Sequence, residues 1–339
     1  MRILVLSIKK IIFPMFILSF ILALVLFSES NLQAVKDGLY LWTNSIIPSL
    51  FPFFVATELL CSTNFLNILG NLLNRFMRPI FNVPGQGSFA FIMGLISGYP
   101  TGAKIVTNLR EKKICSRIEA ERLLAFTNNS GPLFILGFVG ISIFANSEIG
   151  YLLLFTHILS SLTIGLIFRF WKKDIETPTT TKLPISYSIN SKDFGNILTE
   201  SIKKSILSIV NIGGFVVLFS VIISILENCN FINLFSNILE FIKIPETISS
   251  SLISGFFELS NGLNKINIIN SSNLSNLIIL ASFLLGFGGI SVILQVYSII
   301  SKTDISIKPY VLAKLLQGII AAIYTYIFIN STFLFNLNF

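Results

Sequence analysis

The chain has 339 residues, of which 53% are hydrophobic and only 12% are charged, and its mean hydropathy is +0.81. A soluble domain carries about 25% charged residues, so this composition excludes an ordinary soluble protein and indicates a chain embedded in a lipid bilayer. The net charge of +8 does not indicate nucleic-acid binding, because the basic residues are scattered over short loops and form no basic face.

The first apolar segment, residues 11–27, follows Arg2, Lys9 and Lys10. It is longer than the apolar part of a usual signal peptide, and no clear small-residue cleavage site follows it. We therefore favour an uncleaved membrane span within an N-terminal anchor of residues 1–38. A second span is expected over about 39–61, kinked at Pro48 and Pro52.

Residues 64–81 alternate apolar side chains with Asn and Arg at helical spacing, which predicts an amphipathic helix on the membrane surface. Segment 85–113 then has two short apolar arms joined by the Gly- and Pro-containing tip Gly98–Gly102. Each arm is too short to cross a hydrocarbon core of about 30 Å at roughly 1.5 Å per residue. We predict a re-entrant hairpin, which enters the membrane and returns to the same side.

A helix is expected over 119–145, interrupted at Thr127–Pro132, and a further span over about 151–171. Broken backbone at membrane depth is tolerated only inside protein or beside a polar cavity. Two such breaks close together indicate the binding site of a transporter. The hairpin and the broken helix are therefore expected to meet.

The second half repeats this order of elements. After a cytoplasmic linker over 172–203, which is rich in Thr, Ser, Lys and Pro at its start, the sequence predicts a span (206–226) and a surface helix (231–244). The second half then continues with a hairpin over 248–270, which has Glu258–Gly262 at its tip. It ends with a broken helix over 275–301, interrupted at Gly286–Ser291, and a last span (310–329). The two repeats are expected over 39–171 and 204–330.

Each repeat would cross the membrane three times, and an odd number of crossings inverts the second copy. Three pairs of identical residues keep one register, each pair 161 positions apart: Pro84 and Pro245, Gly94 and Gly255, Lys104 and Lys265. With a cytoplasmic N-terminus, 21 of the 24 Lys and Arg fall on the cytoplasmic side or in elements that open from it; the exceptions are Lys36, Lys243 and Lys265. The predicted fold is an all-α polytopic membrane protein with seven transmembrane helices, two re-entrant hairpins and two broken helices in an inverted-topology repeat.

Three runs of residues carry a resemblance to a known family: Ser97–Lys104 (SGYPTGAK), Arg117–Leu123 (RIEAERL) and Phe126–Gly137 (FTNNSGPLFILG). The second-half run Gly286–Val292 (GFGGISV) fits as well. The chain resembles the YlbJ/SpoVV family of sporulation integral membrane proteins over about residues 45–329. That family carries the nucleoside-recognition Gate domain and is related to concentrative nucleoside transporters.

The resemblance implies a transporter that acts in endospore formation and spore cortex assembly. Its implied activity is to move dipicolinate out of the mother cell, across the outer forespore membrane, toward the developing spore. Nucleoside transporters of the wider family carry acidic or amide residues in the first hairpin, whereas residues 89–109 here contain no Asp or Glu and Lys104 is charged. This departure favours an anion over a nucleoside.

Dipicolinate is a flat aromatic dianion, and half-helix N-termini supply free N–H groups and positive potential for such a ligand. Lys104 and Lys265 occupy equivalent repeat positions, so each is a candidate to bind one carboxylate; the alternative is that both extend to their own membrane interface. The candidate substrate-binding residues are Thr101, Lys104, Asn128, Asn129, Ser130, Glu258, Asn261, Lys265 and Ser291.

Several roles have structural alternatives. The Asn128–Ser130 cluster either binds a substrate or ion, or only holds the break through interhelical hydrogen bonds. Glu258 binds a coupling cation, carries a proton or caps a helix. For Glu58 and His157 the choice between a proton relay and a structural hydrogen bond is left open.

Efflux of a dianion from a negative interior gains about 2.3 kcal/mol per charge per 100 mV, so ion coupling is not required. With no nucleotide motif, no Ser/His/Asp set and no metal-ligand cluster in the sequence, we expect neither an enzyme nor a cofactor or metal. Two other functions stay open, namely an ion-coupled transporter of nucleosides or other small solutes and a non-transporting scaffold in sporulation. Homo-oligomer formation and binding of other sporulation membrane proteins also stay open.

Overall fold

The computed structural model describes residues 2–63, 65–172, 191–241, 246–268 and 274–331. These residues lie in helices or in the connections between them, which confirms the all-α class. Within them, five helical segments are long and apolar enough to cross a membrane: Ser28–Cys61, Ser147–Phe168, Phe194–Asn228, Leu274–Ile300 and Ile307–Asn330.

Two of the seven expected spans do not form a single long apolar helix. The first is α1 (Arg2–Leu26), whose apolar part Ile11–Leu26 is shorter than a full span. The second is the broken helix, which separates into α7 (Arg117–Thr127) and the π-helix η2 (Phe134–Ile143). The interruption expected at Thr127–Pro132 is present, and it divides that crossing into two short pieces.

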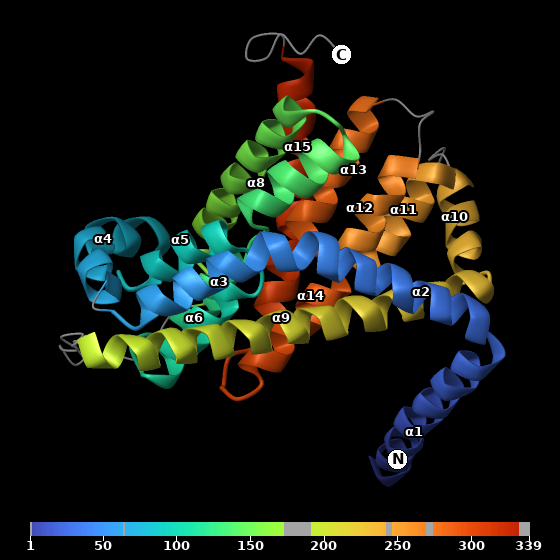
Figure 1. Cartoon of the computed structure of the whole chain (residues 1–339), viewed down its shortest axis with the longest axis horizontal. Coiled ribbons are helices and arrows are strands. Elements are labelled where there is room, and N and C mark those ends of the chain that lie inside the picture. Colours follow the sequence, from blue (N-terminus) through green and yellow to red (C-terminus); the bar gives the residue numbers. More distant parts are fainter. Residues whose placement is uncertain (1, 64, 173–190, 242–245, 269–273, 332–339) are drawn as a thin grey trace.

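The second crossing begins earlier than the sequence indicated. Helix α2 (Ser28–Leu41), the π-helical turn η1 (Trp42–Ile46) and α3 (Ile47–Cys61) form one continuous segment. Pro48 has no N–H to donate, and the widened turn η1 directly precedes it, so the helix continues through the prolines. Helix α9 (Ser191–Asn228) runs alongside this segment in the opposite direction, and Trp42 Nε1 donates to Ile209 O at 3.0 Å (Figure 1).

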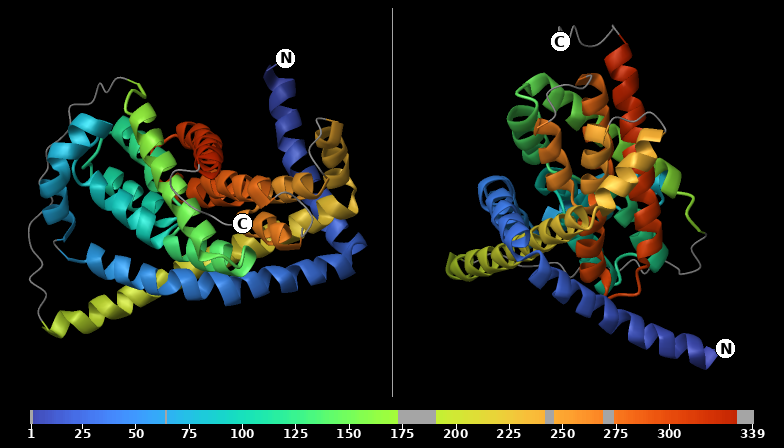
Figure 2. Two further views of the ribbon diagram at one scale, coloured as in Figure 1. Left: turned by 90° about the horizontal axis from the view of Figure 1, so that it is seen from above. Right: turned by 90° about the vertical axis from the view of Figure 1, so that its right-hand side faces the viewer.

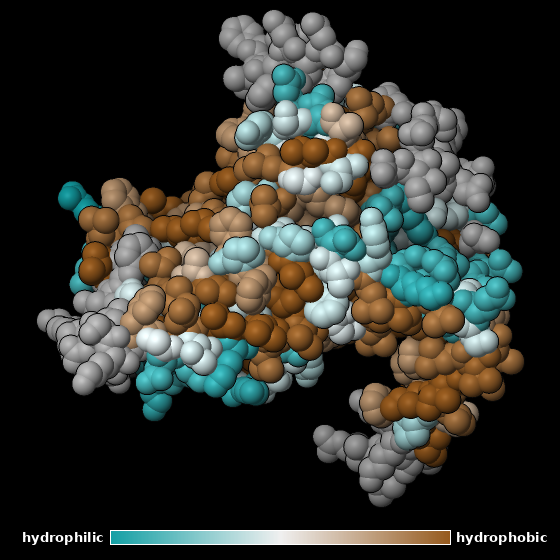
Figure 3. All heavy atoms as spheres, viewed as in Figure 1, coloured by the Kyte–Doolittle hydropathy of each residue, from teal (hydrophilic) through white to brown (hydrophobic). Residues whose placement is uncertain are grey.

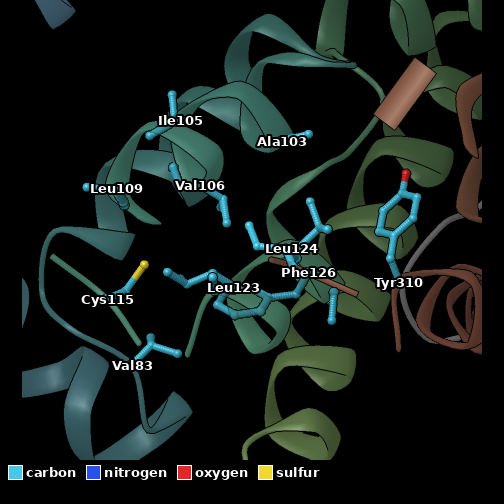
Figure 4. Packing of buried hydrophobic residues seen from close by; sticks show 14 of the residues in the cluster. Val83, Ala103, Ile105, Val106, Leu109, Cys115, Leu123, Leu124, Phe126 and Tyr310 are labelled. Carbon is cyan, nitrogen blue, oxygen red and sulfur yellow. The ribbon is translucent and has the colours of Figure 1, made fainter. Parts of the chain in front are cut away.

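The first hairpin consists of α5 (Gly87–Ser97) and α6 (Thr101–Glu111), preceded by α4 (Phe65–Phe81). The side chains of Ser116 and Glu119 form a capping box that starts α7. Helix α8 (Ser147–Phe168) follows η2. Apolar side chains of α6 and α7 gather between these elements, among them Val106, Leu123 and Phe126 (Figure 4).

The second half contains α10 (Phe231–Phe241), the hairpin α11 (Glu246–Phe257) and α12 (Leu259–Ile268), the broken helix α13 (Leu274–Phe287) and α14 (Gly289–Ile300), and finally α15 (Ile307–Asn330). Helix α9 starts at Ser191. Residues 191–203 are therefore helical rather than part of the linker expected over 172–203, and residues 173–190 of that linker lie outside the described residues.

Helices α8, α13 and α15 pack side by side and cross the pair formed by α2–α3 and α9 (Figures 1 and 2). The two hairpins lie on opposite sides of this crossing in Figure 1, with α5 and α6 toward the left and α11 and α12 toward the right. Helix α1 points away from the body, and its apolar side chains are exposed (Figure 3). Exposed apolar surface of this extent indicates contact with lipid.

Candidate functional site

One small cavity lies where both hairpin tips meet the first helix break and helix α14, just after the second break. Its volume is about 60 Å³, which is smaller than the roughly 300–1,000 Å³ of typical ligand pockets. The lining residues are Ile46, Leu50, Tyr99, Ser130, Gly131, Phe134, Ile212, Val216, Glu258, Leu259, Ser260, Val292 and Gln295.

The first hairpin reaches this cavity through Tyr99, which lies at its tip. Gly98 has φ +79°, and a side chain there would meet the main chain of Gly131 in the break of the first half. Tyr99 Oη donates to Leu285 O at 3.1 Å, close to the break in the second half. The tip of one hairpin thus contacts both breaks, and a glycine at position 98 permits this approach.

One face of α15 holds the first break in place. Asn128 Nδ2 donates to Tyr310 Oη at 2.7 Å, and Gln317 Nε2 donates to Asn129 Oδ1 at 3.0 Å. Between these two contacts, Lys314 Nζ donates to the main-chain oxygen of Asn128 at 2.9 Å. Asn129 Nδ2 also returns to Phe126 O at 2.8 Å. Both asparagines are fully buried, and these bonds keep their side chains within the protein.

Ser130 lies next to these asparagines and lines the cavity. Its main-chain N–H donates to His157 Nε2 at 3.1 Å, so His157 accepts a hydrogen bond at the break. This contact gives the lone histidine a structural partner. Glu58, the other residue with an open role, lies elsewhere and lines a second cavity described below.

Glu258 lies at the tip of the second hairpin and also lines the cavity. Its carboxylate accepts from the main-chain N–H of Asn261 at 2.7 Å, at the start of α12. A carboxylate at this position stabilises the helix N-terminus. The side chain therefore caps α12 and faces the cavity at the same time.

The two hairpin lysines lie outside the central cavity. Lys104 donates to Ser208 on α9 and lines a separate cavity of about 430 Å³ with Glu58 and Lys204. Lys265 donates to Glu227, also on α9, and to Ser254 Oγ at 2.7 Å. The structure thus brings each lysine to α9 and does not bring the two together around one ligand.

Thr101, Asn261 and Ser291 are likewise not among the residues that line the cavity. Thr101 is buried at the start of α6, and its N–H donates to Gly98 O at 3.0 Å. Asn261 Nδ2 donates to Ser220 Oγ at 2.9 Å, and Ser291 Oγ accepts from Gln295 Nε2 at 3.4 Å. Of the nine residues selected from the sequence, Ser130 and Glu258 line the cavity.

Sequence reasoning missed the polar face of α15. Tyr310, Lys314 and Gln317 lie four and three positions apart, so they share one helix face. A lysine well inside an apolar span is a signal of function by itself, although the charge count placed Lys314 with the cytoplasmic residues. The structure instead buries Lys314 completely, beside the break.

Comparisons with known proteins agree with this arrangement. A family model described as Gate, nucleoside recognition, matches residues 44–170. The sporulation integral membrane protein YlbJ of Bacillus subtilis (strain 168) is 38% identical over 314 residues, which cover 87% of this chain and 77% of that protein. The chain belongs to the YlbJ family. It is accordingly an integral, multi-pass membrane protein.

Solved structures of the transporter CNTnw share the fold of this YlbJ-family chain. A variant in an outward-facing state has a TM-score of 0.52 and 13% sequence identity, over 98% of this chain and 86% of that one. CNTnw in an inward-facing, substrate-bound state has a TM-score of 0.50 and 14% identity, over 96% and 85% of the two chains. The chain therefore has a CNT-like, transporter-like fold, and no enzyme family is indicated.

Proposed function

We propose that this chain is a membrane transporter that moves a small aromatic dianion, dipicolinate, out of the mother cell toward the forespore and so supports cortex formation. One observation carries the proposal: both hairpin tips, the first break, helix α14 just after the second break, and the crossing helices α3 and α9 all contribute residues to one small cavity. In transporters built from repeats, substrate binds where the repeats meet. A cavity at that position fits such a transporter.

The proposed topology has seven crossings: α1, α2–α3, α7–η2, α8, α9, α13–α14 and α15. The hairpins 85–113 and 248–270 enter from opposite sides, and the N-terminus is cytoplasmic. Close packing of paired glycines supports the repeat. A side chain at Gly94 would meet Gly102 across the first hairpin, and one at Gly262 would meet Gly255 across the second.

The character of the cavity supports a flat, partly apolar ligand. Tyr99 and Phe134 offer ring surfaces, and Leu50, Val216 and Val292 complete an apolar lining. In this proposal Asn128 and Asn129 hold the break, while Ser130 contacts the substrate.

One observation favours a second candidate, a transporter of nucleosides. Glu258 lines the cavity, and a carboxylate there is a strong acceptor for sugar hydroxyls but repels a dianion. The description of the matching family model, nucleoside recognition, points the same way. A negative charge on Glu258 would therefore favour binding of a nucleoside and oppose binding of a dianion.

Proteoliposomes that contain the purified protein separate these candidates. We expect saturable uptake of labelled dipicolinate that is driven by an inside-positive potential and is competed by unlabelled dipicolinate. Uptake of labelled uridine that depends on an ion gradient, with no dipicolinate uptake, would establish the second candidate instead. Absence of both activities from correctly inserted protein would favour the scaffold.

A further inference from the structure

Lys314 has three acceptors around it and is completely buried. Its Nζ donates to Asn128 O at 2.9 Å and to Gln317 Oε1 at 2.7 Å, and it lies 5.0 Å from the centre of the Tyr99 ring. A lysine ammonium has three N–H donors and no acceptor, and an aromatic face within about 6 Å attracts a cation. Two oxygens and one ring face therefore surround the amino group of Lys314.

The oxygen of Asn128 has a particular position in the fold. Helix α7 ends at Thr127, and Asn128 leaves the helix with φ −101° and ψ 97°. The C-terminal end of a helix carries about half a negative charge on its free carbonyl groups. In secondary transporters, such ends of broken helices coordinate the coupling cation.

The neighbouring amide oxygens are already engaged. Asn128 Oδ1 accepts from Ala103 N at 3.4 Å, and Asn129 Oδ1 accepts from Gln317 Nε2 at 3.0 Å. These are the side-chain oxygens that a metal cation at the break would use as ligands. With these oxygens engaged, Lys314 Nζ is the group that contacts the main-chain oxygen of Asn128 at this helix end.

We propose that Lys314 is a tethered cation which replaces a bound coupling ion at the break in α7. The break is then stable without Na⁺, and transport through the adjacent cavity does not depend on a sodium gradient. The statement about transport rests on the proposed function. The statement that the break is stable without Na⁺ does not, because it concerns the protein without any substrate.

The test compares thermal unfolding of the purified, detergent-solubilised protein in sodium chloride and in N-methylglucamine chloride, without substrate. We expect the same unfolding midpoint in both salts for the unmodified protein. Lys314→Ala removes three methylene groups and the ammonium, so its midpoint falls by several degrees. Propylammonium, which supplies the missing atoms, restores most of the loss, and Na⁺ restores part of it, whereas propanol restores none.

Lys308→Ala is the matched control, because Lys308 is exposed in the first turn of the same helix. Its midpoint stays close to that of the unmodified protein and does not respond to propylammonium. If Lys314→Ala does not fold, Lys314→Met keeps the length of the side chain without its charge. That variant is expected to be less stable than the unmodified protein and to gain stability from Na⁺.

Three results overturn the proposal. They are a saturable stabilisation of the unmodified protein by Na⁺, a Lys314→Ala variant that ignores propylammonium, and a Lys314→Met variant as stable as the unmodified protein in both salts. Because no substrate is present, failure to transport dipicolinate leaves this test intact.

Discussion

At the scale of single residues, the polar side chains at the breaks have two separate tasks. Asn128 and Asn129 form hydrogen bonds inside the protein and set the course of the interrupted backbone. Ser130 and Glu258 line the cavity. Substitutions in the first group are expected to reduce stability, because buried donors and acceptors lose their partners, whereas substitutions in the second group change transport.

Glu258→Gln distinguishes the two candidate substrates. For a dianion we expect the KM to fall by about tenfold, equivalent to about 1.4 kcal/mol, because a like charge is removed from the cavity. For a nucleoside the KM rises, because a charged acceptor is lost. Uptake kinetics in proteoliposomes measure either change. Glu148→Gln is the control, since Glu148 is exposed at the start of α8, away from the cavity; an equal change in both variants would contradict a direct role for Glu258.

Asp304 links the loop between α14 and α15 to the end of α6. Its carboxylate pairs with Arg110 at 2.9 Å and 2.7 Å, and this hydrogen bonding lowers the pKa of Asp304 below the ordinary value of 3.8. A lowered carboxyl pKa stabilises the fold above the ordinary pKa, and the contribution is lost as the pH falls through the folded pKa.

We therefore expect Asp304→Asn to lower the unfolding midpoint at pH 6 to 8 by an amount that shrinks as the pH falls below about 4. The loss is modest, because Asp304 is about half exposed. Arg110→Gln should give a similar pH profile, since it removes the other partner. A difference between Asp304→Asn and the unmodified protein that stays constant down to pH 3 would argue against this ion pair.

At the scale of elements, the hairpins depend on close contact between backbones. A side chain at Gly102, in the first turn of α6, would meet the main chain of Thr127 and Asn128 in the break. The second break makes a similar contact, since a side chain at Gly289 would lie 3.1 Å from Gly255 O in the second hairpin. Each hairpin therefore packs so closely against the break of its own repeat that these glycine positions have no space for a methyl group.

Gly102→Val is expected to destabilise the protein by about 1–3 kcal/mol and to reduce transport, because the hairpin and the break are forced apart. Thermal unfolding and dipicolinate uptake measure these effects. Gly214→Ala is the control, because a side chain there meets nothing within 4 Å and Ala favours the helix over Gly by about 0.5–1 kcal/mol. Equal behaviour of the two variants would show that the hairpin does not need the close contact.

Element order was predictable because helix breakers interrupt apolar runs at recognisable points. Gly98 and Pro100 mark the first hairpin tip, and Gly288 and Gly289, both with φ +83°, mark the second break. The extent of α2–α3 and of α9 was not predictable from hydropathy. Residues 28–38 and 191–203 are too polar to be recognised as membrane helix from hydropathy. They are helical because each continues a longer helix that packs against the rest of the protein.

The candidate site was predictable in part for a similar reason. Breaks identify where the backbone is exposed to a cavity, so Ser130 and Glu258 were found. The side chains that hydrogen-bond to the broken segment are set by tertiary packing. Tyr310 and Lys314, for example, come from a helix about 180 residues later in the chain. The same packing takes Lys104 and Lys265 away from the cavity and places them against α9.

At the scale of the whole molecule, the proposed topology makes Cys229 the accessible thiol on the external side. It is exposed at the end of α9, whereas Cys115 is buried. Burial raises the pKa of the Cys115 thiol to about 12, so little reactive thiolate forms at neutral pH. The proposed cytoplasmic N-terminus places Cys229 outside and the end of α3 inside.

We expect a membrane-impermeant maleimide, added to intact non-sporulating cells that carry the protein in their plasma membrane, to label the unmodified protein and not Cys229→Ser. Labelling is measured by the mass shift of the purified chain. Cys61→Ser serves as the control and should be labelled like the unmodified protein. Labelling of Cys229 only after the membrane is opened would reverse the proposed orientation.

The attachment of both hairpin lysines to α9 has a mechanical consequence. Ser208 and Glu227, which accept from Lys104 and Lys265, lie 19 residues apart, or about 28 Å along a helix. This length is close to the roughly 30 Å of a bilayer's hydrocarbon core. In the proposed topology, α9 therefore separates the two lysine contacts by nearly the thickness of the hydrocarbon core. Under the proposed transport function, we expect the transport rate to respond to bilayer thickness.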